Sequence, residues 1–494
     1  MTDATPGRVE LDSGRGRIVI ATVVLGSAVA MLTATVVNVA LPTLAADLDA
    51  SSSEQKWIIN GYTLTLAALI LIGGSFGDRW GRVRMYRIGV VWFAAASVLC
   101  AASWDTRSLI AFRLLQGIGG ALLTPGSLAI IQTTLRPDDR GRGVGLWSGI
   151  GGVAGAIGPL VGGLLVEVSW RWVFVINLPV AAAAFVLSFW VPESRDESAA
   201  DSELDVRGAA LTALVLGTAS YALIEGPEAD FSTFEIVCTV VAVAAAAGLW
   251  TVERGRDHAM LPLELFRDRV FAAANAVTFT IYGGMAVLFF LLSVQLQVTA
   301  GWSPVRAGTA LLPVTLLMLL LSARAGEVAG RVGPRIPLTV GSFVVAGGMV
   351  LMTRVGPDAS FWRDVLPAVV VFGLGLSLIV APVTSTALNA VPDERAGAAS
   401  GVNNAVARTA GLFSVAAIPG FVGLTGDALG DPAQLDPGFS RAMLVAAAVV
   451  AAAGVLAFVM LPSDPALCDE SKRPHPAPCP VDGRASTPER PTRA

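Results

Sequence analysis

Charged residues are scarce in this sequence of 494 residues, where Asp, Glu, Lys and Arg together make up 15% of the chain. Soluble domains carry about 25% charged residues, and a soluble chain of this length would divide into several domains, each with its own polar surface. Apolar residues reach 54%, and the mean hydropathy is +0.66. The chain therefore has too little polar surface for a soluble protein of its size. Its net charge of −4 gives no indication of nucleic-acid binding.

Histidine and paired cysteine are nearly absent as well. The two histidines, His258 and His475, lie in polar connecting segments, which argues against a catalytic histidine or a His-rich metal site. The four cysteines include no Cys-x-x-Cys pair, so neither a zinc site nor a redox motif is indicated.

Two further absences concern catalysis and energy supply. No Gly-x-x-x-x-Gly-Lys-Ser/Thr loop occurs, so ATP is not expected to be the driving force. A membrane enzyme would need clustered His, Asp or Glu near one membrane face, and the sequence offers no such cluster. We therefore expect no metal, no cofactor and no enzymatic activity.

What the sequence does contain is a series of long apolar runs. A helix needs about 20 apolar residues to cross the bilayer core, where it satisfies its own backbone hydrogen bonds. The first run is too long for a signal-peptide core and is expected to be a retained span. The sequence thus predicts an all-helical membrane protein with fourteen transmembrane helices, in runs at 18–42, 57–77, 85–103, 108–134, 142–166, 172–192, 206–226, 233–252, 270–298, 304–326, 336–354, 365–390, 397–424 and 441–461.

Basic residues are distributed unevenly between the connecting loops. With the N-terminus in the cytoplasm, the inner segments hold 25 Lys and Arg residues and the outer segments hold 7, while Arg113 and Arg408 fall within spans. Cytoplasmic loops of membrane proteins carry an excess of Lys and Arg. We therefore expect a multi-pass protein of the plasma membrane with both termini in the cytoplasm.

Two loops of related sequence indicate an internal repeat. Residues 74–82 read GSFGDRWGR after the second run, and residues 326–335 read GEVAGRVGPR after the tenth. If runs seven and eight are an insertion, the tenth run is the second span of a second six-helix unit. We expect two pseudo-symmetric six-helix bundles around a central cavity. The expected parts are an N-terminal tail (1–17), the first bundle (18–192), a cytoplasmic linker (193–207), two inserted helices (208–252), a cytoplasmic loop (253–269), the second bundle (270–461) and a disordered tail (462–494).

The segment at 74–82 is the most specific stretch of the chain and resembles the cytoplasmic loop signature of the major facilitator superfamily. Its characteristic positions are Gly74, Asp78, Arg79, Gly81 and Arg82. Asp78 is expected to bind a helix N-terminus or an arginine and so to hold the two halves together on the cytoplasmic side. The simpler alternative is an ordinary basic loop of the positive-inside kind.

Two other stretches strengthen the resemblance. The segment RLLQG from Arg113 to Gly117 resembles the superfamily's intramembrane arginine motif, and GAIGPLVGG from Gly155 to Gly163 resembles its antiporter motif. The segments NVALP (38–42), WRWVFVINLP (170–179) and the region from Gln297 to Pro313 look like the fourteen-helix drug:proton antiporter branch. The resemblance covers about residues 18–461. It implies a multidrug exporter that moves small molecules against protons by alternating access.

The resemblance also implies roles for individual residues. Arg113 and Gln116 would couple proton movement to substrate movement; the alternative for Arg113 is a structural hydrogen-bond donor. An unpaired charge within the bilayer costs at least about 2.5–3.5 kcal/mol, so Arg113 is expected to face the bundle interior. A flexible seam between helices, or simply close packing, is the expected role of the small residues of the antiporter motif and its proline, namely Gly155, Gly158, Pro159, Gly162 and Gly163.

One position departs from the pattern of this branch. Its members commonly carry an aspartate in the first span where this chain has Thr33, so a carboxylate that could take up a proton is missing. Glu225, near the outer end of the seventh run, is a candidate substitute, although a loop-facing carboxylate is the simpler interpretation.

A cavity for amphipathic molecules needs a mixture of aromatic and polar side chains. The candidates for this lining are Asn38, Tyr62, Trp147, Phe289, Phe290, Gln295, Asn403 and Arg408. Core packing or anchoring at the membrane interface is the alternative for each of them.

The predicted partners are therefore a small-molecule substrate, protons and the lipid bilayer, and we expect a monomer. Two other functions stay open at this point: a dedicated exporter of one endogenous metabolite or lipid, and a non-transporting receptor with a transporter fold.

Overall fold

The computed structural model describes residues 9–195, 204–254, 261–392 and 395–463. Within these ranges the chain is helical, and the only β-type pairing is an isolated bridge between Val9 and Leu135. The predicted disordered tail lies outside the described residues from position 464 on. Residues 1–8 of the N-terminal tail, most of the predicted linker and residues 255–260 also lie outside them.

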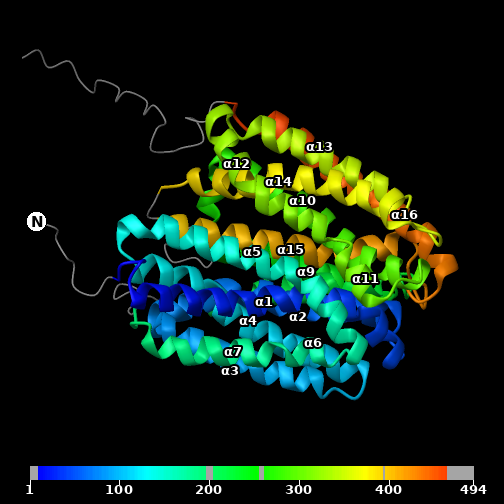
Figure 1. The fold of residues 1–494 in the computed structure, drawn as a ribbon, viewed down its shortest axis with the longest axis horizontal. Helices are drawn as coiled ribbons and strands as arrows, with labels where there is room; N and C mark the ends of the chain where they lie inside the picture. Colours follow the sequence, from blue (N-terminus) through cyan, green and yellow to red (C-terminus); the bar gives the residue numbers. More distant parts are fainter. Residues whose placement is uncertain (1–8, 196–203, 255–260, 393–394, 464–494) are drawn as a thin grey trace, which may run out of the picture.

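The helices fall into two bundles with a helix pair between them in the chain (Figure 1). The N-terminal bundle contains α1 (Gly14–Asp47), α2 (Ser52–Trp80), α3 (Arg82–Ala101), α4 (Thr106–Thr134), α5 (Pro137–Val168), α6 (Trp172–Val175) and α7 (Asn177–Leu187) with η1 (Ser188–Trp190). The pair consists of α8 (Val206–Glu225) and α9 (Thr233–Glu253). The C-terminal bundle follows η2 (Leu263–Arg267) and contains α10 (Arg269–Val294), η3 (Gln295–Thr299), α11 (Pro304–Thr309), α12 (Leu312–Val332), α13 (Arg335–Met352), η4 (Phe361–Val365), α14 (Leu366–Asn389), α15 (Ala396–Phe421) and α16 (Pro432–Met460).

Twelve helical segments of the described residues are long and apolar enough to cross a membrane. They correspond to twelve of the fourteen predicted runs. The other two runs, at 142–166 and 397–424, coincide with α5 and α15, which are long helices but are not among these twelve. Helix α5 has no charged residue between Arg142 and Glu167, but several side chains in its middle lie outside the described residues, and the apolar stretch among those described is Ile157–Val168. Helix α15 carries polar side chains in its middle. The count of fourteen spans is therefore not confirmed by length and apolar composition.

Local sequence explains where several helices begin. Ser51 and Glu54 form a reciprocal capping box at the start of α2, and Asp105 caps α4. Such caps satisfy backbone N–H groups that have no partner within the helix. The N–H of Ser108, together with its hydroxyl, holds the pKa of the Asp105 carboxyl below its ordinary value.

The inserted pair lies on one side of the contact between the bundles. Helix α8 packs against α2 of the N-terminal bundle and α15 of the C-terminal bundle, and α9 packs against α8. Large apolar side chains of α9, among them Phe234, Val240 and Val243, are exposed. A helix with such a surface is suited to face lipid. The pair therefore covers the contact between α2 and α15 without entering either bundle.

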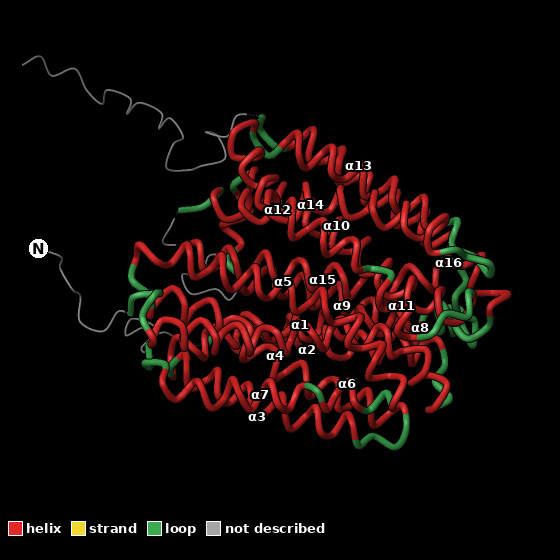
Figure 2. The backbone as a smooth tube through the Cα atoms, viewed as in Figure 1, coloured by secondary structure: helices red, strands yellow, loops and turns green. Residues whose placement is uncertain are grey.

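Besides a small cluster that joins α2, α8 and α15 through Ala67, Ala68, Leu216 and Leu412, one large apolar core joins the two bundles at one end. Its members from the N-terminal bundle come from the half that holds residues 36–58, 100–109 and 166–174. In the opposite half, the apolar core of the N-terminal bundle and the smaller core around Phe271 and Ala399 are separate clusters. We call the joined end, where α11 and the N-terminus of α2 lie, the closed end. In Figure 2 the tubes of the two bundles converge toward the side where α11 lies.

Candidate functional site

A buried arginine lies at the centre of a hydrogen-bonded network in the N-terminal bundle. Arg113 of α4 is 1% exposed. Its Nε donates to the carbonyl of Ile58 in α2 at 3.0 Å, and one terminal nitrogen donates to Oε1 of Gln116 at 2.6 Å. The guanidinium also lies 4.7 Å from the centre of the Tyr62 ring. Each of these partners is neutral, so the positive charge of Arg113 is not compensated by a carboxylate.

The network continues from Gln116 to the first helix. Gln116 donates to the hydroxyl of Ser97 in α3 at 2.8 Å, and the Asn177 side chain of α7 donates to the same hydroxyl at 3.4 Å. The hydroxyl of Thr33 in α1 donates to Oδ1 of Asn177 at 3.1 Å. Thr33, which stands in place of the usual acid, is thus connected to Arg113 through neutral side chains. Sequence reasoning missed Ser97 and did not assign Asn177 to the site, because their contact depends on how α3 and α7 pack.

A second arginine lies at the middle of α15. Arg408 is half-buried and forms no hydrogen bond or ion pair with the described residues. It lies close enough to Tyr62 of α2 and Tyr282 of α10 to act on both electrostatically. Ala405 and Leu412, on the same face of α15 as Arg408, pack against apolar clusters of the N-terminal bundle, so Arg408 lies where the two bundles meet.

Carboxylates are distributed differently from these two arginines. Every Asp and Glu within the described helices lies in the first or last two turns of its helix. The described residues also contain no group of His, Cys, Asp and Glu arranged to hold a metal ion. The middle of the helical region therefore contains fixed positive charge without fixed negative charge.

The glycines of the antiporter-like motif bring α5 close to two other helices. A Cβ at Gly158 would collide with Thr35 of α1, and one at Gly162 would come within 3.0 Å of Val36. A Cβ at Gly163 would collide with the backbone at Pro304, at the start of α11.

Helix α11 also has a glycine at its contact with α5. A Cβ at Gly308 would collide with the carbonyl of Pro159, whereas Gly155 has open space around it. Helix α5 thus packs closely on its own bundle and on the other bundle, as small residues permit.

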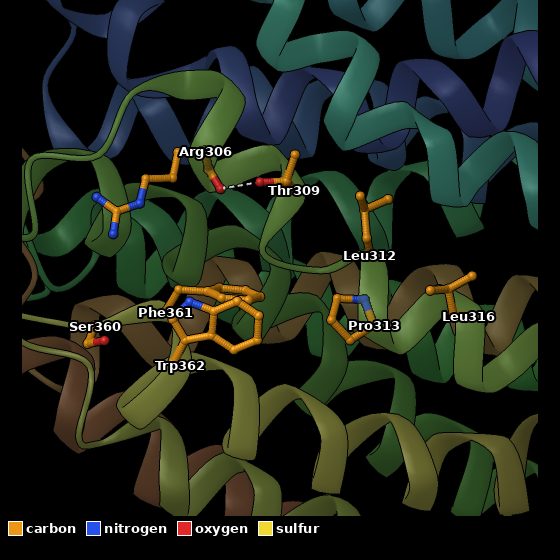
Figure 3. Close-up of a pocket in the computed structure, with 8 residues that line it drawn as sticks. All are labelled: Arg306, Thr309, Leu312, Pro313, Leu316, Ser360, Phe361 and Trp362. Carbon is orange, nitrogen blue, oxygen red and sulfur yellow. Dashed lines mark hydrogen bonds between the residues drawn. The ribbon is translucent and has the colours of Figure 1, made fainter.

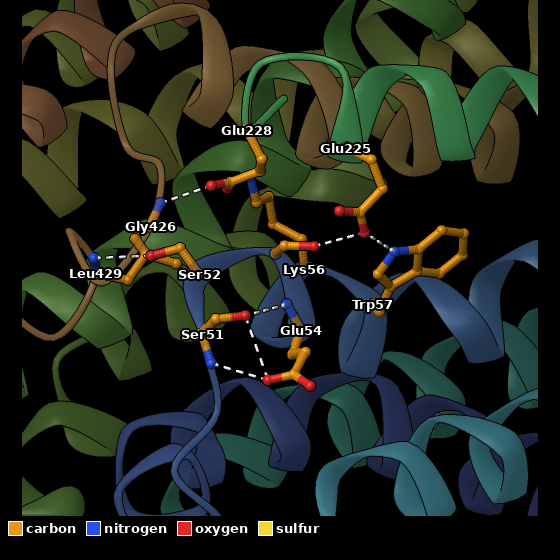
Figure 4. Close-up of polar contacts among 10 residues, drawn as sticks. Ser51, Ser52, Glu54, Lys56, Trp57, Glu225, Glu228, Gly426 and Leu429 are labelled. Atoms are coloured by element: carbon orange, nitrogen blue, oxygen red, sulfur yellow. Dashed lines mark hydrogen bonds and ion pairs between the residues drawn. The ribbon is translucent and has the colours of Figure 1, made fainter. Parts of the chain in front are cut away.

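Polar side chains join three segments at the closed end (Figure 4). Lys56 of α2 is fully buried and forms an ion pair of 3.0 Å with Glu228, which lies between α8 and α9. The other oxygen of Glu228 accepts a hydrogen bond of 2.6 Å from the N–H of Gly426, between α15 and α16. We call Lys56, Glu228 and Gly426 the closed-end network. It connects the N-terminal bundle, the inserted pair and the C-terminal bundle.

Other direct hydrogen bonds between the bundles lie at the same end. The N–H of Ser52 donates to the carbonyl of Gly426 at 2.8 Å, and Gln297 donates to the carbonyl of Val39 at 3.0 Å. Lys56 and Glu228 could not be selected from the sequence, because each is an ordinary charge near a loop until the fold brings them together.

Glu225 lies beside this network and away from Arg113. Its Oε1 accepts hydrogen bonds from the Ser53 hydroxyl at 2.6 Å and from the indole N–H of Trp57 at 2.7 Å. The structure therefore brings Glu225 to the start of α2, at the closed end, and not to the network around Thr33.

The motif at 74–82 folds within its own bundle. Asp78 forms an ion pair of 2.6 Å with Arg82, one turn further along. The Glu193 carboxylate accepts hydrogen bonds of 2.9 Å from the N–H groups of Val83 and Arg84, at the start of α3. Gly81 has a φ of +106°, a conformation that favours glycine. The expected contact of Asp78 across to the other half is not among its recorded bonds in this conformation.

The remaining predicted cavity residues have varied surroundings. Asn38 has a buried Oδ1 without a hydrogen-bond partner. Trp147 donates to the Ser27 hydroxyl, and Asn403 donates to Asn275 and Thr278. Gln295 is fully buried and donates to the Val355 carbonyl and to Asp436. Phe290 is 1% exposed, and Phe289 packs edge-on against Phe372. In this conformation Gln295 and Phe290 are therefore part of the C-terminal bundle's interior.

A cavity of about 530 Å³ lies on the C-terminal bundle near α11 (Figure 3). It is lined by Arg306, Thr309, Leu312, Pro313, Leu316, Ser360, Phe361 and Trp362. All of these residues belong to one bundle. The cavity is therefore separate from the region between the bundles where Tyr62 and Arg408 lie.

Comparison with known proteins gives one family. The family model described as Major Facilitator Superfamily matches residues 23–416. The tetracenomycin C resistance and export protein of Streptomyces glaucescens is 32% identical over 80% of this chain and 74% of its own length. The puromycin resistance protein of Streptomyces alboniger is 32% identical over 89% of this chain and 90% of its own. The methylenomycin A resistance protein of Bacillus subtilis is 33% identical over 82% of this chain and 87% of its own length.

Solved structures of low sequence identity share the fold. A bacterial homolog of the human lysosomal transporter Spinster, in an inward-facing and unoccupied conformation, aligns with a TM-score of 0.65 at 15% identity over 94% of this chain and 99% of that chain. The POT family transporter PepTSo aligns with a TM-score of 0.66 at 13% identity over 89% of this chain and 96% of that chain.

Proposed function

Because this chain belongs to the major facilitator superfamily, we propose that it is a secondary transporter that exports small hydrophobic or amphipathic compounds, including antibiotics. The observation that carries this proposal is that the two helical bundles share their large apolar core at one end, whereas their cores are separate clusters in the opposite half. Such an arrangement lets a site between the bundles open to one side of the membrane at a time. The names of the relatives, which include resistance and export proteins for three antibiotics, support export as the direction.

We further propose that α5 and α15 cross the membrane with the twelve apolar segments, which gives fourteen spans. The polar side chains of α15 do not prevent this, because α15 packs against α2, α8 and α10 and so needs little contact with lipid. With both termini in the cytoplasm, the closed end is extracellular and the structure is inward-facing. The protein works as a monomer in the plasma membrane.

Proton entry drives the cycle in this proposal. Arg113 and Gln116 connect α2, α3 and α4 by hydrogen bonds around one buried charge. A change in the surroundings of that charge would therefore alter how these three helices pack. Thr33 cannot titrate, which leaves Glu225 as the proposed carboxylate for proton uptake. Its position at the closed end would expose it to external protons once that end opens.

Inverted membrane vesicles test this function. An imposed proton gradient should cause accumulation of at least one compound from a panel of toxic dyes and antibiotics, and Arg113→Ala should reduce that accumulation at least about tenfold. A charge removed at the bundle centre would leave Gln116 and Tyr62 without their cation. Arg441→Gln is the control, because Arg441 is exposed and bonds only within its own helix.

The coupled-export proposal is wrong if no compound accumulates and cells carrying Arg113→Ala remain as resistant as the wild type. The number of compound classes transported distinguishes a multidrug exporter from a dedicated one. A multidrug exporter moves several unrelated dyes, whereas an exporter dedicated to one metabolite moves a single class.

A further inference from the structure

We propose that the region around Arg408, at the contact of α15 with α2, binds the negatively charged part of the substrate, so that this transporter selects anionic amphipathic compounds over cationic ones. This inference rests on the proposed export function and specifies its substrate class. Three independent features of the described residues carry it: the sign of the central charge, an unpartnered hydroxyl and an adjacent apolar surface.

The first feature is the sign of the charge between the bundles. Arg408 lies at the contact between the bundles, Arg113 lies inside the N-terminal bundle, and neither forms an ion pair with any described residue. No carboxylate lies in the middle of a described helix, and the position of the usual acid holds Thr33. In surroundings of low dielectric constant, two uncompensated cations attract an anion and repel a cation strongly. The missing counter-charge is what an anionic substrate would supply.

The second feature is the hydroxyl of Tyr62. This side chain is 1% exposed, and its hydroxyl has no hydrogen-bond partner. Buried hydroxyls normally have a partner, because an unmade hydrogen bond costs about 1–3 kcal/mol. The Arg113 guanidinium lies 4.7 Å from the centre of the Tyr62 ring, and the charge of Arg408 also acts on Tyr62. A phenol within the electrostatic reach of two guanidinium groups is suited to donate to a carboxylate, sulfonate or phenolate oxygen.

The third feature is an apolar surface beside Arg408. Tyr282, Met285 and Phe289 follow one another on one face of α10 and are all only half-buried. Arg408 acts on Tyr282, and Ala286 lies against Gly411, one turn beyond Arg408 in α15. An apolar body could therefore rest on α10 while its anionic group contacts Arg408 and Tyr62. This combination matches an amphipathic anion better than a small inorganic one.

The charge of such a substrate also affects whether the transporter needs an acid at position 33. A monovalent anion that leaves a cell with an interior potential of −100 mV can be concentrated outside about fifty-fold by the potential alone. A cation would need proton exchange to be exported against the same potential. Thr33 in place of an acid is therefore compatible with export of an anion.

A matched pair of dyes tests the inference. Fluorescein is anionic and rhodamine 6G is cationic, and both have a xanthene ring system. Binding to the purified full-length protein is measured by fluorescence polarisation. We expect fluorescein to bind at least about tenfold more tightly than rhodamine 6G. Arg408→Gln should weaken fluorescein binding about tenfold and leave rhodamine 6G binding unchanged or stronger, whereas Arg408→Lys should restore fluorescein binding to within about threefold.

Two further variants keep the test independent of folding defects. Tyr62→Phe removes only the hydroxyl and should weaken fluorescein binding several-fold without affecting rhodamine 6G. Arg306→Gln removes an exposed arginine from the separate cavity near α11 and should leave the binding of both dyes unchanged. The inference is wrong if rhodamine 6G binds as tightly as fluorescein, or if Arg408→Gln binds fluorescein like the wild type.

Uptake into inverted vesicles separates failure of this inference from failure of the proposed function. Uptake of rhodamine 6G without uptake of fluorescein would overturn the substrate class and leave export intact. Uptake of fluorescein that follows the membrane potential but ignores the proton gradient would support the anionic site and contradict proton coupling. If neither dye nor any compound of the broader panel is taken up, the export function itself is wrong.

Discussion

At the scale of single residues, the network between Thr33 and Arg113 consists of hydrogen bonds between neutral side chains. Thr33, Asn177, Ser97 and Gln116 connect α1 to the buried guanidinium through four helices. Hydrogen bonds to a buried charge stabilise it, but they do not neutralise it. The charge of this region is therefore sensitive to any acid placed within the network.

Thr33→Asp is expected to reverse the charge preference of the transporter. A carboxylate at this fully buried position would partly compensate Arg113 and weaken the attraction for anions. Inverted vesicles that carry this variant should take up less fluorescein and more rhodamine 6G, each by about threefold or more. Thr33→Asn is the control, because it changes the size and hydrogen bonding of the side chain without adding charge. An equal loss of both dyes in the two variants would mean that position 33 acts through packing alone.

At the scale of helices, the contact between α5 and α11 decides how closely the two bundles approach at the closed end. Gly163 and Gly308 place backbone against backbone there, next to Pro159. Sequence analysis identified the glycines of α5 as close-packing residues, but not their partner. Gly308 carries no recognisable motif, and its importance follows only from the position of α11.

Gly308→Ala is expected to open the closed end. The added methyl group would collide with the carbonyl of Pro159, so α5 and α11 would have to separate. A cysteine introduced at Asn38 should then react faster with a membrane-impermeant maleimide added from outside the cell. Gly330→Ala is the matched control, because a Cβ at that glycine meets no atom within 4 Å. Unchanged reactivity in the Gly308 variant would contradict the role of this contact.

The inserted pair α8–α9 contributes to the same closure through Glu228. Its carboxylate binds the buried Lys56 of one bundle and the N–H of Gly426 in the other. Removal of one partner of a buried ion pair leaves the other charge uncompensated, which commonly costs about 3–5 kcal/mol. The two helices outside the bundles are thus expected to influence the opening of the transport path.

Glu228→Gln should shift the population toward states with an open outer end. Spin labels at Thr353 and Glu167, on the outer ends of the two bundles in the proposed orientation, should show a broader and longer distance distribution in this variant. Asp230→Asn is the control, since Asp230 is exposed and has no recorded hydrogen bond or ion pair. The same distance distribution in both variants would show that the closed-end network is not needed for closure.

At the scale of the whole molecule, the proposed orientation rests on the basic residues of the loops and can be tested with native cysteines. Cys100 and Cys238 are buried in the structure, whereas Cys468 and Cys479 belong to the predicted cytoplasmic tail. A membrane-impermeant maleimide should therefore label the protein in inverted vesicles but not in intact cells. Replacement of Cys468 and Cys479 by serine should abolish the labelling. Labelling in intact cells that disappears in this double variant would place the tail outside.

Much of the architecture could be predicted from the sequence because hydrophobicity is a local property. The runs at 206–226 and 233–252 differ by no more than one residue at either end from α8 and α9. The runs at 142–166 and 397–424 also coincide with helices, and α15 carries polar side chains and Arg408 in its middle, unlike the twelve apolar segments. Contact with protein instead of lipid relaxes the need for apolar side chains, so composition alone could not establish α15 as a span.

The residues of the candidate site divide in the same way. Arg113, Gln116 and the glycines from Gly155 to Gly163 could be selected from the sequence, because a charge within an apolar run and small residues four apart are visible in it. Their partners Ser97, Tyr62 and Gly308 depend on contacts between distant segments. Which end is closed, and the position of Arg408 between the bundles, likewise depend on how whole bundles pack. The sequence by itself determined that this protein resides in a membrane as two related helical halves, because burial in lipid requires that composition everywhere along a span. Only the tertiary structure decided which charges remain uncompensated between those halves, because compensation depends on distance in space and not on position in the chain.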